Sequence, residues 1–107
     1  MKQTVKDLSD LISYFAKHYD EQIPRNKRTK TIVRLQAVFK QIEYNHNYLK
    51  DHTKLLEFCM LRISQAISEL SCDNYEARCC TYNKHIIELL STCLANLTRE
   101  VSIWVTF

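Results

Sequence analysis

The residues of this 107-residue chain that could hold a metal ion are its five cysteines and four histidines. A zinc site needs four such ligands that converge on one point, which on helices requires pairs three or four residues apart. The candidate group is Cys72, Cys79, Cys80 and His85, in which Cys72 and Cys79 lie seven residues apart and Cys80 and His85 lie five apart. Neither spacing brings two ligands together on one helix, so we predict neither a metal nor a cofactor.

The cysteines are instead expected to be free thiols in a reducing compartment. Their odd number leaves at least one of them unpaired in any disulfide scheme within the chain. Cys59 and Cys93 fall on apolar positions of helical patterns, where a thiol acts as a small hydrophobic group. Cys72 lies just before the last predicted helix, whose amides could stabilise a thiolate. No further sequence signature marks it as a nucleophile.

Arg78 and His85 are separated by six residues on the last predicted helix. Their spacing is close to two helical turns, so the two side chains share a face. The pair resembles the arginine–histidine motif of the HEPN family of helical-bundle ribonucleases, whose arginine and histidine meet across a dimer to cleave RNA. The resemblance covers these two residues and the fold class, and it implies RNA cleavage as one alternative function. Because no other catalytic constellation is present, we predict that the chain is not an enzyme.

The positive charge of the chain is concentrated in one short segment. Residues 25–34 contain five basic residues and no acidic residue, whereas the whole chain has a net charge of +3. The basic residues are Arg25, Lys27, Arg28, Lys30 and Arg34. They fall in a predicted linker and the first turn of the second helix, where the helix dipole disfavours cations. We therefore expect the segment to contact an acidic protein surface or phosphate. No aromatic residue is interleaved with these cations, so a nucleic acid would be bound through its backbone alone.

The composition and the apolar spacing predict an all-α protein. The chain has no glycine and one proline, which excludes dinucleotide folds and phosphate loops and makes most β-sandwiches untenable. Apolar residues at three- and four-residue steps predict a first helix over residues 4–19, ended by Pro24, and a second helix that begins near residue 29 or 31. An unbroken heptad frame over 30–71 permits one long coiled-coil-like helix. The asparagines and histidines within 45–53 favour a break instead, and both alternatives stay open.

The last predicted helix, over residues 75–104, carries an apolar surface too broad for one partner helix to cover. We predict a single domain over 1–107, a small antiparallel helical bundle of three or four helices. Because residual apolar surface implies a partner, the expected function is a protein-interaction or oligomerisation module, with another protein or a second copy as partner. The expected contact residues are Leu97, Val101, Trp104 and Phe107. The alternative is a nucleic-acid-binding module that contacts phosphates through residues 25–34.

The beginning of the chain carries no targeting signal that we recognise. Residues 1–20 alternate charged and apolar side chains and contain no apolar run of the length that a signal peptide or a membrane span requires. We therefore expect an intracellular protein, cytoplasmic or nuclear, that does not contact membranes.

Overall fold

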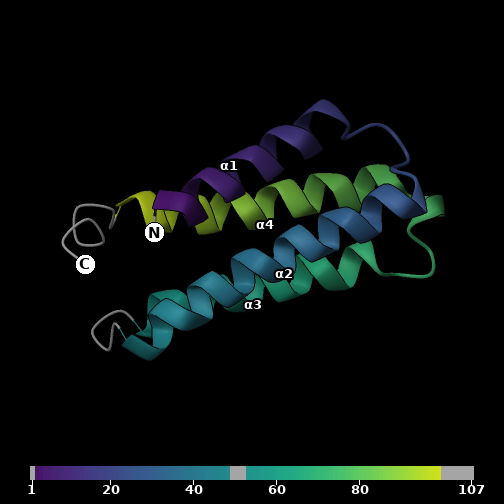
Figure 1. Ribbon diagram of the computed structural model, residues 1–107. Helices are drawn as coiled ribbons and strands as arrows, with labels where there is room; N and C mark the ends of the chain where they lie inside the picture. Colours follow the sequence, from purple (N-terminus) through teal and green to yellow (C-terminus); the bar gives the residue numbers. More distant parts are fainter. Residues whose placement is uncertain (1, 49–52, 100–107) are drawn as a thin grey trace.

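Four α-helices and one short 3-10 helix are found in residues 2–48 and 53–99, the part of the chain that this computed structural model describes. The α-helices are α1 (Lys2–Lys17), α2 (Arg25–Tyr48), α3 (Thr53–Leu70) and α4 (Cys79–Arg99), and the 3-10 helix η2 (Glu76–Arg78) leads directly into α4. Consecutive α-helices run in opposite directions (Figure 1). The predicted small antiparallel bundle is therefore confirmed.

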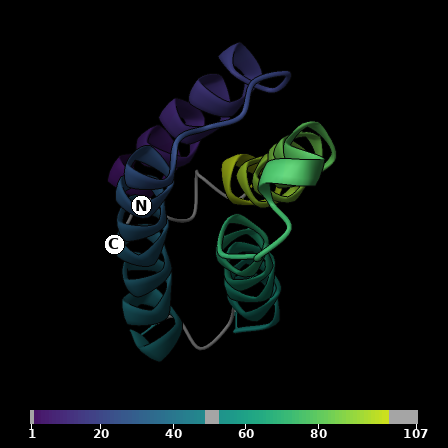
Figure 2. The ribbon, with the colours of Figure 1, turned by 90° about the vertical axis from the view of Figure 1, so that its right-hand side faces the viewer.

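The α-helices surround one apolar core. Helix α1 packs mainly against α4, α2 packs mainly against α3, and α3 packs in turn against α4. Figure 2 shows the same arrangement from the end of the bundle, which measures 43 × 21 × 19 Å. Burial of the apolar stripe of each helix is the main force that holds such a bundle together. The fully buried side chains include Leu8, Leu11, Phe15, Leu35, Ile42, Leu56, Ile63, Ile86, Leu90 and Leu97.

Pro24 lies directly before the first residue of α2, whereas α1 has already ended at Lys17, so Pro24 is not what ends the first helix. The first helix stops at Lys17, two residues before the predicted end, and α2 begins at Arg25 rather than near residue 29 or 31. The earlier start has a simple cause, because proline is well suited to the first turn of a helix, where its missing N–H has no intrahelical acceptor. The Arg28 N–H donates a 2.9 Å hydrogen bond to the Pro24 carbonyl group. The basic segment therefore lies within the first turns of α2 and not in a linker.

The long heptad frame belongs to two helices and not to one. Helix α2 ends at Tyr48 and α3 begins at Thr53, so the alternative of one continuous helix over 30–71 is wrong. Leu35 and Ile42 on α2 and Leu56 and Ile63 on α3 are all fully buried in the same core. Two antiparallel helices that face one core can each keep a seven-residue spacing, so the frame alone does not distinguish a rod from a hairpin.

The last helix begins later than predicted. Tyr75 precedes η2, and α4 (Cys79–Arg99) begins at Cys79 instead of at the predicted residue 75, while the predicted end at 104 lies outside the described residues. Residues Val101, Trp104 and Phe107 lie outside the described part of the chain. Tyr75 is fully buried, so the segment before α4 contributes to the core rather than extending the helix.

Candidate functional site

The apolar contact surface expected near the C-terminus is represented in the described chain only by Leu97. Its side chain has no exposed area and belongs to the central core. Leu97 therefore cannot reach a partner while the bundle is folded, and this part of the expectation requires correction. The other three expected contact residues lie beyond residue 99, outside the described segment.

The basic segment is divided by the fold into exposed and buried positions. Arg25, Lys27, Lys30 and Arg34 are exposed on α2. Arg28 is buried, with 9% of its surface exposed. Since α2 follows the 3.6-residue period, Arg28 falls on the stripe that faces the core, whereas the other four cations fall on the sides and the outer face.

Arg28 holds the bundle together rather than facing solvent. Its Nη1 donates a 2.8 Å hydrogen bond to the carbonyl group of Ile23, and its guanidinium carbon lies 4.3 Å from the centre of the Tyr75 ring. A cation over an aromatic face is attracted by the negative potential of the ring. Arg28 was predicted as part of a contact surface for an anionic partner, and its burial corrects that prediction.

Tyr75 and Asn83 complete this buried polar network. The Tyr75 hydroxyl group donates to Asn83 Oδ1 at 2.8 Å and accepts the Ile23 N–H at 3.4 Å. Asn83 Nδ2 donates to the carbonyl group of Glu21 at 2.9 Å, and the carbonyl groups of Tyr19 and His18 lie at 3.3 and 3.4 Å. Burial is the main cause that raises the pKa of Tyr75 above its ordinary value, so the phenol stays protonated and can donate. The network fixes the connection between α1 and α2, and therefore the start of the basic helix.

Sequence reasoning missed Tyr75, Asn83 and one further cation, Lys40. Tyr75 and Asn83 resemble ordinary helix residues in the sequence, and only the fold brings them to the loop 52 to 65 residues earlier. Lys40 lies beyond the cluster at 25–34 but is exposed on the same helix. We define the basic face of α2 as Arg25, Lys27, Lys30, Arg34 and Lys40.

The cations of the basic face have no carboxylate partner within the described chain. The ion pairs within 4 Å found there join His18 to Glu21, His46 to Glu57 and His85 to Glu69. Helix α2 contains six lysines and arginines and one acidic residue, Glu43. The basic face therefore carries positive charge that the part of the chain described here does not neutralise.

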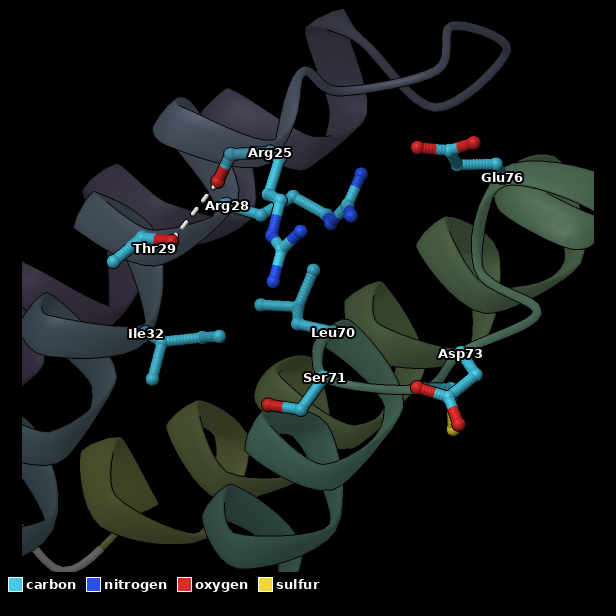
Figure 3. Close-up of a pocket in the computed structure, with 9 residues that line it drawn as sticks. Arg25, Arg28, Thr29, Ile32, Leu70, Ser71, Asp73 and Glu76 are labelled. Atoms are coloured by element: carbon cyan, nitrogen blue, oxygen red, sulfur yellow. Dashed lines mark hydrogen bonds between the residues drawn. The ribbon is translucent and has the colours of Figure 1, made fainter.

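A cavity of about 370 Å³ lies beside this face, between the start of α2 and the connection from α3 to η2. Figure 3 shows Arg25 and Arg28 reaching from α2 toward the side of the cavity that carries Asp73, on the connection, and Glu76, at the start of η2. No ion pair within 4 Å joins these arginines to these carboxylates in the described structure. The two carboxylates would repel a phosphate group placed in the cavity. The exposed part of α2, from Lys27 to Lys40, is therefore a better anion-binding surface than the cavity.

In the described structure, no hydrogen bond connects Arg78 with His85 of the same chain. Arg78 is exposed at the end of η2, and His85 pairs through Nδ1 with Glu69 on α3. The second carboxylate oxygen of Glu69 is buried and has no hydrogen-bond partner in the described structure. A carboxylate that orients an imidazole is one component of acid–base chemistry. No second catalytic group is placed against His85 among these contacts.

The cysteines and the histidines that the structure describes do not gather into a metal site. Within residues 2–48 and 53–99, no three side chains of histidine, cysteine, aspartate or glutamate are placed to hold one ion. Cys59 and Cys93 are both fully buried, and the Cys93 thiol lies 3.6 Å from the Cys59 carbonyl group. The neighbouring Cys59 thiol and burial both raise the pKa of Cys93 well above its ordinary value. Cys93 is therefore a neutral core residue and not a nucleophile.

The described helices include none with the length and apolar character needed to cross a membrane. Comparison of this chain with protein-family models, curated proteins and solved structures found no match. The basic face of α2 is therefore the candidate site on structural grounds alone.

Proposed function

We propose that this chain is a non-enzymatic interaction module that binds the acidic surface of another protein through the basic face of α2. The observation that carries the proposal is the set of exposed cations on this helix, none of which has a carboxylate within 4 Å in the described structure. Such a surface attracts negatively charged partners and accelerates their association.

Helix stability does not account for the positions of these cations. The first turn of α2 contains no acidic residue, although the positive end of the helix dipole favours acids there. Arg25 and Lys27 instead lie at this end and cost a few tenths of a kcal/mol each. A role in binding explains why cations occupy positions at which acidic side chains would make the helix more stable.

The proposal is tested with two probes at physiological salt, a poly-glutamate peptide and a short DNA duplex. The Lys27→Glu, Lys30→Glu, Arg34→Glu variant is expected to lose at least about tenfold in affinity for poly-glutamate. The control variant Lys2→Glu, Lys6→Glu, Lys54→Glu changes the net charge equally at exposed positions of α1 and α3, and it is expected to lose much less. An equal loss in both variants overturns the proposal, because binding then depends on net charge and not on α2.

A nucleic acid is the second candidate partner, and the spacing of Lys27, Lys30 and Arg34 favours it. Steps of three and four residues align these cations along one side of α2, as backbone contacts to successive phosphates require. In that case the DNA duplex binds more tightly than poly-glutamate, and the logarithm of its affinity falls steeply with the logarithm of the salt concentration.

A ribonuclease is the remaining candidate, and the pairing of His85 with Glu69 favours it, because a carboxylate-oriented imidazole is a suitable general base. It requires a second chain to supply the Arg78 that the resemblance to HEPN ribonucleases implies. RNA that stays intact during prolonged incubation with the protein removes this candidate. Cleavage that disappears in the His85→Ala variant establishes it.

A further inference from the structure

The outward side of α2 carries exposed apolar side chains that alternate with two cations of the basic face. Lys30, Val33, Ala37, Lys40 and Tyr44 follow one another at alternating steps of three and four residues, and all are exposed. Val33 and Tyr44 have 58% and 63% of their surface exposed. Steps of three and four residues keep a line of side chains on one side of a helix, which is the geometry by which two helices pack. We call these five residues the outer seam.

The outer seam differs from the outward sides of the other helices. The exposed large hydrophobic residues of the described chain are Tyr19, Val33, Tyr44 and Leu61, and two of them lie on the outer seam. Tyr19 follows the end of α1, and Leu61 is the one that α3 contributes. In Figure 2 the outward side of α2 is covered by no other described helix. Helix α2 thus has an inner apolar stripe that packs in the core and a second, weaker one that faces away from it.

Shallow grooves border the outer seam on both sides. One groove, of about 430 Å³, lies between α1 and α2 and is lined by Gln3, Thr4, Ala37, Lys40, Gln41, Tyr44 and Asn45. The other, of about 390 Å³, lies between α2 and α3 and is lined by Gln36, Phe39, Lys40, Ser64 and Ile67. A ridge between two grooves is the surface onto which a further helix can pack by placing its own side chains in the grooves.

We propose that the outer seam docks an amphipathic helix of another protein whose apolar line is flanked by aspartates and glutamates. This inference rests on the proposed function and names the kind of partner. Acidic side chains beside the docked apolar line would pair with Lys30, Arg34 and Lys40, while Val33 and Ala37 would contact the apolar line itself. Charge complementarity of this kind sets partner choice and orientation in helix pairs.

The same charges argue against two other occupants. A second copy would place one α2, with six lysines and arginines and one glutamate, against another, and like charges across an interface are repulsive. A nucleic acid would use the cations but would gain nothing from Val33, because phosphate contacts do not require an apolar side chain. Dependence of binding on Val33 therefore separates a helical protein partner from a nucleic acid.

The test is a display library of helical peptides with fixed apolar residues at steps of three and four. The positions that flank the apolar line are free to be glutamate, glutamine or lysine. Selection on the full chain is expected to enrich glutamate at the flanking positions. The Val33→Ser variant, which removes the apolar side chain without adding a charge beside Lys30 and Arg34, is expected to lose about tenfold in affinity for the selected peptides. Leu61→Ser is the matched control, since Leu61 is 66% exposed on α3, and its affinity is expected to stay unchanged.

The outcomes separate this inference from the proposed function. Enrichment of glutamate with equal binding to the Val33→Ser and Leu61→Ser variants overturns docking on the outer seam but keeps an acidic partner for the basic face. Enrichment of lysine overturns both, whereas no enrichment overturns docking of a helix and leaves the proposed function to the poly-glutamate test. A selected peptide that loses affinity equally in both variants shows a binding surface elsewhere and also overturns the inference. Circular dichroism of the variants confirms that each exposed substitution leaves the bundle folded.

Discussion

The hydroxyl group of Tyr75 donates a 2.8 Å hydrogen bond to the side-chain carbonyl of Asn83, and neither residue has exposed surface. Through this bond the segment before η2, the first half of α4 and the connection from α1 to α2 are joined in one polar network. The network holds the start of α2 in place. The basic face therefore projects from a rigid support rather than from a loose linker.

Replacement of Asn83 by alanine is expected to destabilise the bundle by about 3 kcal/mol, because it leaves the Tyr75 hydroxyl and the Glu21 carbonyl group without their partner. Urea denaturation, monitored by circular dichroism, measures this change in the free energy of unfolding. The matched control is Asn47→Ala, at an exposed position of α2, which is expected to change the free energy of unfolding by less than about 0.5 kcal/mol. Equal effects in the two variants would show that the buried network contributes little.

The substitution Arg28→Met is expected to lower the free energy of unfolding by about 1–3 kcal/mol, since it removes the hydrogen bond to Ile23 and the cation over Tyr75. Arg28→Lys is expected to restore only part of this loss, because lysine lacks the planar guanidinium group. Lys27→Met at the neighbouring exposed position is the control and is expected to be nearly neutral. The interpretation of Arg28 as a structural residue fails if Arg28→Met keeps full stability.

The stability of the bundle is expected to fall as the pH rises above about 9. The pKa of Cys93 is raised from its ordinary value of 9.0 by the neighbouring Cys59 thiol and by burial. The same contact lowers the pKa of Cys59, whereas burial disfavours the thiolate at both cysteines and sets the direction for the pair. The folded state therefore keeps a proton that the unfolded chain loses above this pH, and the free energy of unfolding decreases by up to about 1.4 kcal/mol per pH unit. Urea denaturation between pH 8 and 10 measures the slope.

The variant Cys93→Ala supplies the comparison for this pH dependence. It is expected to be less stable at neutral pH, because it leaves a small cavity, but to lose less stability between pH 9 and 10. An unchanged slope in the variant would assign the alkaline loss to other groups.

Much of the fold follows from the spacing of apolar residues. Leu8, Leu11 and Phe15 predict the buried stripe of α1, and the heptad frame predicts the buried positions of α2 and α3. The frame did not decide whether the chain turns near residue 50, because a hairpin and a rod present the same spacing. Pro24 was interpreted only as the end of a helix, although proline is equally compatible with the first turn of the next one.

The candidate site was less predictable than the fold, because its division into buried and exposed parts depends on contacts between distant segments. The cluster of cations at 25–34 is visible in the sequence, but the burial of Arg28 depends on Tyr75, which is distant in the sequence. Leu97 was expected at a partner surface because the apolar side of α4 is broad, whereas α1 and α3 together cover it. A count of apolar residues does not show how many neighbours a helix has.

The most direct test of binding by the basic face is a titration of the isotope-labelled chain with the poly-glutamate peptide, in which amide chemical shifts are measured by NMR at each peptide concentration. We expect the largest shifts at Lys27, Lys30, Arg34 and Lys40, with little change along the outward sides of α1 and α4. Shifts that are concentrated on another helix, or that stay absent at saturating peptide, would contradict the assignment of α2 as the binding surface.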